Sequence, residues 1–206
     1  MKYYFSGVMS SAELDILREA GASHILLDAH VWRKLSAGAT FARVCLDSGA
    51  YQAFKNGGLL DLDHWANIAA PLAESSDHIE MLVAPDAIGD PDLTRYNFEW
   101  IMDQYPHIGC IPVWQWGASG DDLRYFLDQS DVVGLGGLVP HLRSRWRDRL
   151  SKDTRKIWDD QRHAVLDQVI EVCQQYPHRF HFFGLGWLPA IKALEDLLYS
   201  ANGTLW

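Results

Sequence analysis

The sequence predicts an α/β protein, a compact (β/α)8 barrel of the TIM type whose last helix is missing or shortened. Eight short apolar runs alternate with helical patterns, which is typical of parallel βαβ units. Five of these runs end in acidic, amide or glycine residues, and a (β/α)8 barrel builds its active site from polar groups at the carboxyl ends of its strands. We expect residues 1–206 to form one domain, small for such a barrel.

The first half of the chain alternates between strand and helix patterns in a regular way. Strands are expected at 2–5, 24–28, 42–47 and 78–84, where apolar residues run toward a polar or glycine ending. A helix is expected from Ser10 or Ser11 to Gly21, because Ser11 suits an N-cap and Gly21 a stop. A polar loop at 55–58 precedes a helix over 63–74. Asp90 as N-cap and Pro91 at the first helical position open a further helix that reaches Gln104.

The second half continues the alternation, with one long interruption. Strands are expected at 108–113, 132–135, 179–183 and 198–206, and helices at 120–129, 159–175 and 189–198. The long connection between 135 and 159 holds seven of the 18 basic side chains. Because the chain stops directly after the eighth strand, the final barrel helix is expected to be absent, short or supplied from elsewhere.

Composition favours a cytosolic protein with free thiols. The three cysteines, Cys45, Cys110 and Cys173, lie far apart, which argues against a disulfide framework or a zinc cluster. The first residues are too soon interrupted to form a signal peptide, and no apolar run is long enough to span a membrane.

Charge is distributed unevenly along the chain. The formal net charge is −9, but residues 143–156 hold seven of the 18 basic side chains and two acidic ones, so this segment carries +5 and the remainder −14. With Trp146 embedded in it, the segment fits either a phosphate contact zone or a solvated helix face. In the first case Arg143, Arg145, Arg147 and Arg149 contact the backbone of a nucleic acid.

Polar residues at the strand ends form the candidate site. Asp47 is followed by Ser48 and a glycine, which allow a ligand to approach the backbone, and Asp86 follows a stiff Ala-Pro pair. Gln115 offers both a donor and an acceptor to a planar heterocycle. Aromatic residues able to stack on such a ring, or else to pack in the core, are Tyr51, Phe54, Trp114, Trp116 and Trp187.

Other kinds of site are disfavoured by spacing. The glycines of residues 134–137 are not the spaced dinucleotide fingerprint, although Gly136 and Gly137 are placed to offer backbone N–H groups. His24, His30, His78 and His181 lack the spacing of metal ligands, so neither a metal nor a cofactor is expected. An aldolase-type barrel is disfavoured as well, because no convincing lysine lies at a strand end.

Four of these motifs, in this order, resemble a known superfamily. The chain resembles the tRNA-guanine transglycosylases, and more closely the 7-deazaguanine DNA transglycosylases of phages and bacteria. There Asp-Ser-Gly-Ala-Tyr, Pro-Asp-x-x-Gly-Asp, Gly-Leu-Gly-Gly and a final Ser-x-Asp-Ser-x-x-Trp recur. The corresponding segments here are 47–51, 85–90, 134–137 and 200–206.

The resemblance implies an enzyme that exchanges guanine in a polynucleotide, DNA more than tRNA, for a 7-deazaguanine. In such a reaction one carboxylate attacks C1′ of the nucleotide and a second handles protons, as in retaining glycosidases. Asp47 matches the acid/base aspartate. The positions that match base recognition are Asp86 and Gln115, with Ser48, Gly136, Gly137 and Gly186 nearby.

The sequence departs from the pattern at the expected nucleophile, because Asn202 occupies that position. An amide is a poor nucleophile and carries no charge to stabilise an oxocarbenium ion. Three interpretations stay open: an enzyme disabled by substitution, a natural relative that uses Asp47, Asp86 or water, and a barrel that binds a base or nucleotide without chemistry. Hydrolysis of free nucleosides belongs to the second of these, and a dimer that completes the site is compatible with all three.

Overall fold

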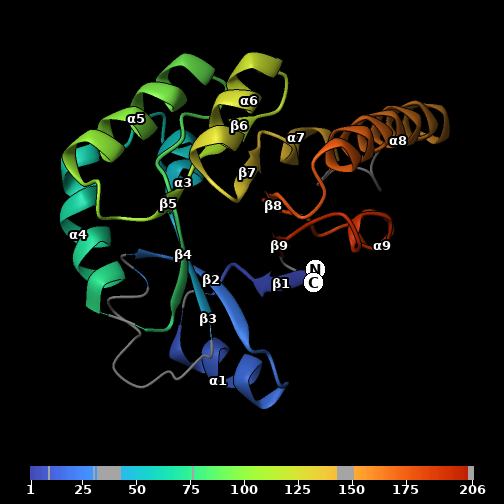
Figure 1. The fold of residues 1–206 in the computed structure, drawn as a ribbon. Coiled ribbons are helices and arrows are strands. Elements are labelled where there is room, and N and C mark those ends of the chain that lie inside the picture. The colour runs from blue at the N-terminus through green and yellow to red at the C-terminus, as the bar shows by residue number, and fades with distance from the viewer. Residues whose placement is uncertain (9, 30, 32–42, 76, 143–150, 204–206) are drawn as a thin grey trace.

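The computed structural model describes residues 1–8, 10–29, 31, 43–75, 77–142 and 151–203. Within these ranges nine parallel strands form one sheet that curls into a nearly closed barrel (Figure 1). The order of neighbours is β5-β4-β3-β2-β1-β9-β8-β7-β6. The strands are β1 (Lys2–Phe5), β2 (His24–Asp28), β3 (Arg43–Asp47), β4 (Ile79–Val83), β5 (Cys110–Ile111), β6 (Val113–Gln115), β7 (Val133–Gly136), β8 (Phe180–Phe182) and β9 (Ser200–Gly203).

The two strands at the ends of this order follow each other directly in the chain. β5 pairs with β4, β6 pairs with β7, and Pro112 alone separates them. The expectation of one strand over 108–113 is therefore wrong in its bounds, since strand pairing starts at Cys110, breaks at Pro112 and continues to Gln115. A proline has no N–H to give to a ladder, although the Pro112 carbonyl still accepts from Gly134 N across 2.8 Å.

Helices pack on the outside of the barrel. Figure 1 shows α4, α5 and α6 along one side, and α8 extending away from the body on the other. The rings of Phe98 and Phe126 meet edge to face at 5.6 Å and join α5 to α6. The helices of the described residues are α1 (Ser11–Glu19), α3 (Ala50–Lys55), α4 (Leu62–Ser75), α5 (Pro91–Gln104), α6 (Gly120–Gln129), α7 (Val139–Leu142), α8 (Lys152–Gln175) and α9 (Leu188–Leu194).

Helix starts follow the capping rules, with two corrections. The Asp90 side chain accepts from Leu93 N, as expected. Ser10 rather than Ser11 caps α1, because its extended backbone lets its hydroxyl accept from Glu13 N. The expected start of a helix at 159 is wrong by seven residues, because Ser151 supplies a cap that accepts from Thr154 N.

Two short helices were not expected from the sequence, and one helix is shorter than expected. Apolar periodicity does not reveal α3 or α7, because each has fewer than two turns. Gly49, with φ 82°, turns the chain from β3 into α3. α9 ends at Leu194, four residues before the expected end at Leu198. The last expected strand is described as Ser200–Gly203, and the expected residues 204–206 lie outside the described range.

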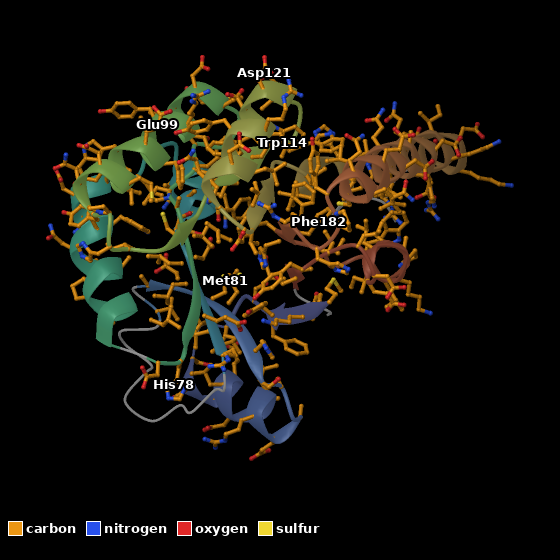
Figure 2. The ribbon with its side chains drawn as sticks, in the orientation of Figure 1. His78, Met81, Glu99, Trp114, Asp121 and Phe182 are labelled. Atoms are coloured by element: carbon orange, nitrogen blue, oxygen red, sulfur yellow. The ribbon has the colours of Figure 1, made fainter. Side chains whose placement is uncertain are left out.

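Alternating side chains divide the apolar residues into an outer and an inner cluster. The outer cluster packs between strands and helices, and includes Val44 and Leu46 of β3. Cys45, between them, belongs to the inner cluster that fills the barrel, together with Tyr4, Leu26, Met81, Val83, Ile111 and Val113. Figure 2 shows Met81 near the middle of the ring of strands, and Glu99 and Asp121 on the outer helices. All three cysteines are buried free thiols, as expected.

A polar cluster closes the amino-terminal end of the barrel. The register between β3 and β4 shifts at Val44/Cys45 and skips Glu80. Glu80 accepts hydrogen bonds from Lys2, from Tyr4 (2.8 Å) and from Tyr199 (3.2 Å), all on strands across the barrel or next to them. Burial alone raises the pKa of Glu80, but these bonds and the Lys2 charge outweigh it, so its pKa lies below the ordinary value.

In the part of the chain that the structure describes, no helix combines the length and the apolar character that crossing a membrane requires.

Candidate functional site

The carboxyl ends of β2 and β3 place two carboxylates side by side. Asp28 and Asp47 are the last residues of these strands and are partners in the parallel register. The residues directly before them face outward, so the side chains of Asp28 and Asp47 face the inside of the barrel. Because both residues end their strands, they lie at the carboxyl-terminal mouth of the barrel. Gly49 makes room for this pair, because a Cβ on Gly49 would lie 2.6 Å from Asp28 Oδ2.

A third carboxylate enters from the loop that follows β4. Ser48 Oγ donates to Asp86 Oδ1 at 3.3 Å, and the Gln115 side-chain amide donates to Asp86 Oδ2 at 2.6 Å. Ser48 thus connects the end of β3 to this loop, and Gln115 connects the end of β6 to it. The four predicted residues Asp47, Ser48, Asp86 and Gln115 are brought together at one edge of the barrel.

Gln115 presents an unused acceptor to this site. Its side chain is 3% exposed, and among the described residues its Oε1 is a buried oxygen that accepts no hydrogen bond. Gly136 and Gly137 lie against it, since a Cβ on Gly136 would be 2.9 Å from Gln115 Nε2 and one on Gly137 3.0 Å from Oε1. A buried acceptor without a donor is costly, so this oxygen indicates a position for an N–H or O–H group of a ligand.

Asp47 and Asp86 have pKa values well above the ordinary value of an aspartate. Burial raises the pKa of Asp47 to about 7, helped by the negative charges of Asp86 and Asp28 and opposed by a hydrogen bond from Ser48 N. Burial also raises the pKa of Asp86 to about 6, although hydrogen bonds from Gln115 and Ser48 favour its charged form. Because these charges repel, the site favours holding a proton near neutral pH.

Asn202 lies on β9 and is joined to a buried histidine. Its Oδ1 is 2.9 Å from Nε2 of His181, and Nδ1 of His181 is 2.7 Å from Ser200 Oγ. His181 is fully buried and Asn202 is 6% exposed. Burial lowers the pKa of His181 to about 4, so its imidazole is neutral at physiological pH.

The remaining predicted residues lie elsewhere. Gly186 is in the turn between β8 and α9, where its N–H donates to Gly184 O at 3.0 Å and is therefore engaged within the turn. The four arginines expected to contact a nucleic-acid backbone, Arg143, Arg145, Arg147 and Arg149, lie outside the described residues. Lys152, Arg155 and Lys156 of the same basic segment lie in the first turns of α8.

Sequence reasoning did not select Asp28 or His181. Asp28 follows an apolar run in the same way as Asp47, so the same signal was present. His181 carried no signal, because it is a single histidine within an apolar run and its partners are 19 and 21 residues away.

Two pockets flank the carboxylates. One of about 190 Å³ is lined by Asp28, Ser48, Gly49 and residues of α3 and α4, including Gln52 and Trp65. The second, about 260 Å³, reaches Asp86 between α3 and α5 and is rimmed by the exposed side chains of Phe54, Leu59 and Tyr96. Within the described residues, no three His, Cys, Asp or Glu side chains are grouped so as to hold a metal ion.

The site therefore combines a buried acceptor that lacks a donor, Gln115 Oε1, with a carboxyl group, that of Asp47, whose pKa is raised to about 7. Comparison of the chain with protein-family models, with curated proteins and with solved structures gives no match.

Proposed function

We propose that the protein is a base-exchange glycosyltransferase, of the guanine and 7-deazaguanine transglycosylase type that its motifs resemble. The observation that carries this proposal is the bonded pair of Asp86 and Gln115, with its unused Oε1 acceptor, next to Asp47 with its pKa of about 7. Together they provide recognition of a base edge and a proton-transfer group within one site.

We also propose the type of barrel. We take β5 and β6 as one strand interrupted at Pro112, which makes the nearly closed sheet an eight-stranded (β/α)8 barrel of the TIM type. Such barrels carry their active sites at the carboxyl ends of the strands, where Asp28, Asp47 and Gln115 lie.

Base recognition follows from donor and acceptor matching. Guanine and its 7-deaza analogues present neighbouring N–H donors at N1 and N2. The Asp86 carboxylate and Gln115 Oε1 are acceptors fixed by their mutual hydrogen bond. Tyr51 and Phe54 on α3 are 47% and 54% exposed and supply rings for stacking near the mouth.

The proposed chemistry assigns Asp47 the transfer of protons. As the C1′–N9 bond breaks, its electron pair passes to the departing base, which takes a proton from neutral Asp47, and the sugar is left as an oxocarbenium ion at C1′ until the incoming base attacks. The Asp47 carboxylate then accepts the proton that the incoming base loses when its N9 attacks C1′. A carboxyl group with a pKa near the working pH serves well in both directions.

Asn202 favours a second function, in which the barrel binds a purine or deazapurine base or nucleotide without exchange. Its oxygen is held by His181, and its amide nitrogen is not a nucleophile at C1′. In that case the site keeps its affinity for the base and catalyses neither exchange nor hydrolysis.

The experiment supplies labelled guanine or 7-cyano-7-deazaguanine together with DNA, tRNA or a free nucleoside. Denaturing gels follow incorporation of the label, and mass spectrometry follows the released base. Incorporation into a polymer supports exchange and identifies the acceptor. Release without incorporation indicates a hydrolase, and tight binding of the base with neither product indicates the binding protein.

The acceptor is tested separately through salt dependence. If the basic segment 143–156 contacts phosphates, the affinity for a polynucleotide falls steeply with salt. Replacing Arg145 and Arg147 by Ala then reduces the slope of log affinity against log salt by about 2, one for each phosphate that is no longer neutralised. An affinity that does not depend on salt points to a free base or nucleoside.

A further inference from the structure

Three buried side chains form a continuous hydrogen-bonded chain that reaches the carboxyl end of β9, the end of the parallel barrel at which the candidate site lies. Ser200 and Asn202 both lie on β9, and His181 lies on the neighbouring strand β8 between them. The rings of Phe183 and Tyr4 contact the imidazole at centroid distances of 4.6 and 5.9 Å, so its orientation is fixed by packing as well as by hydrogen bonds.

The direction of the hydrogen bonds between Ser200, His181 and Asn202 follows from the number of hydrogens that each group can donate. The neutral imidazole has one N–H and one lone pair, and the serine hydroxyl has one hydrogen. Ser200 Oγ is 2.7 Å from His181 Nδ1 but 4.0 Å from the weak thioether acceptor of Met81. The hydroxyl therefore donates to Nδ1, the imidazole hydrogen is on Nε2, and Nε2 donates to Asn202 Oδ1.

This direction determines what Asn202 offers to the site. Its oxygen is engaged by the imidazole, which leaves Nδ2 as the end of the side chain that can donate to a ligand. Asn202 is 6% exposed, so it is not fully enclosed. The free end of Asn202 is therefore a pair of N–H donors.

We infer that His181 is a positioning residue that fixes Asn202 as a hydrogen-bond donor to an acceptor atom, oxygen or nitrogen, of the bound base or nucleoside. This inference rests on the proposed function and extends it, because Asn202 then has a recognition role instead of the role of a nucleophile. A rotated amide would present Oδ1 and would select a donor on the ligand, so the two orientations make opposite predictions.

The first measurement is independent of any ligand. Nitrogen NMR of the full chain labelled in its histidines reports the tautomer of His181, with His24 as internal reference because it pairs with Ser23 at 2.8 Å in a more exposed setting. We expect His181 as the neutral tautomer with hydrogen on Nε2. Hydrogen on Nδ1, or a charged imidazole at neutral pH, would overturn the inference.

The second measurement compares variants by calorimetric titration with guanine and 7-cyano-7-deazaguanine. Asn202→Ala removes the donor and His181→Leu removes its anchor, and each is expected to weaken binding about 3–10-fold, the value of one neutral hydrogen bond. His181→Gln supplies an N–H in a similar place and is expected to restore most of the affinity. Equal losses in the Leu and Gln variants would reduce His181 to a packing residue and overturn the inference.

Failure of the proposed function is distinguishable from failure of this inference. If the wild-type protein binds neither base, the proposed function and the donor role of Asn202 fail together, while the tautomer still decides the direction of the hydrogen-bonded chain. If the wild type binds and Asn202→Ala binds equally well, the proposed function stands and the donor role is overturned.

Discussion

The side-chain amide of Gln115 donates to a carboxylate oxygen of Asp86 across 2.6 Å and joins the end of β6 to the loop after β4. This bond orients both side chains. It occupies one Asp86 oxygen and turns Gln115 Oε1, an acceptor without a donor among the described residues, toward Gly137. Two acceptors on one rigid edge are the basis of the proposed base recognition.

Replacing Gln115 by Leu tests this edge. The variant loses the Oε1 acceptor and the bond to Asp86, so we expect the affinity for guanine to fall about 10–100-fold, the value of one to two hydrogen bonds including one to a charged group. The pKa of Asp86 rises further, because the lost bond favoured its charged form. Titrations over a pH series should show the pH of half-maximal binding moving upward.

Gln129→Leu, at the exposed end of α6, is the matched control and should bind like the wild type. A downward shift of the pH midpoint in Gln115→Leu would contradict the assignment.

Asp47→Asn tests proton transfer. The amide cannot exchange a proton, so incorporation of labelled base should fall by a factor of about 100 or more. Asp128→Asn, an exposed change on α6, should keep full activity. Activity of Asp47→Asn within a few-fold of the wild type would remove Asp47 from the mechanism.

The same substitution should stabilise the fold at high pH. The pKa of Asp47 is raised from 3.8 to about 7 in the folded protein, so the folded state binds more protons than the unfolded chain between these values. Stability therefore falls as pH rises from about 4 to about 7, and the loss is complete above pH 7.

Asp47→Asn removes this loss, which is about 1–3 kcal/mol once solvent at the mouth is allowed for, or about 3–8 °C in Tm. Melting curves at pH 8 should show the increase and those at pH 4 should show almost none. An equal increase at both pH values would mean that the titration of Asp47 is not its source.

Two glycines on β7 allow the effect of a displaced Gln115 on base affinity to be distinguished from the effect of overpacking on stability. A Cβ on Gly136 would lie 2.8 Å from Val113 Cγ1 and 2.9 Å from Gln115 Nε2, so Gly136→Ala displaces Gln115. A Cβ on Gly134 meets the ring of Phe183 and Val113 but not Gln115. Both variants should lose about 1–3 kcal/mol in urea unfolding because of overpacking. Only Gly136→Ala should also lose base affinity, and equal affinities in the two variants would contradict this account.

Glu80→Gln tests the polar cluster at the opposite end of the barrel. Its lowered pKa means that the carboxylate adds stability above its unfolded value of 4.5, and that this contribution is lost as pH falls through the folded value. We expect a loss of about 1–3 kcal/mol at pH 7 and little difference at pH 3, measured by urea unfolding.

Glu99→Gln breaks an exposed pair with Arg95 and should cost about 0.5 kcal/mol or less. If the two substitutions lower the free energy of unfolding by the same amount at pH 7, the hydrogen bonds of Glu80 do not stabilise this end of the barrel.

The sequence by itself indicated the alternation of strands and helices and several of the polar residues that lie together at the strand ends. Asp47, Asp86 and Gln115 were predictable because each follows an apolar run, and parallel strands bring such endings to one edge. The cap at Asp90 was predictable because capping depends on neighbouring residues alone. Asp28 ends an apolar run in the same way as Asp47, so the sequence indicates it equally well.

Only the tertiary structure decided which side chains meet and in what state. His181 contacts Ser200 and Asn202, 19 and 21 residues away, because β8 and β9 are neighbours in the barrel, and no local pattern encodes that pairing. β5 and β6, which Pro112 separates, are the first and last strands of the sheet. That these two strands are the ends of one curled sheet follows from the strand pairing, which no local pattern encodes. The pKa of Asp47 depends on burial and on Asp86 and Asp28, and these are properties of distance in space. Local rules fix what each segment forms, whereas charge and hydrogen bonding in the site depend on contacts that the folded barrel creates.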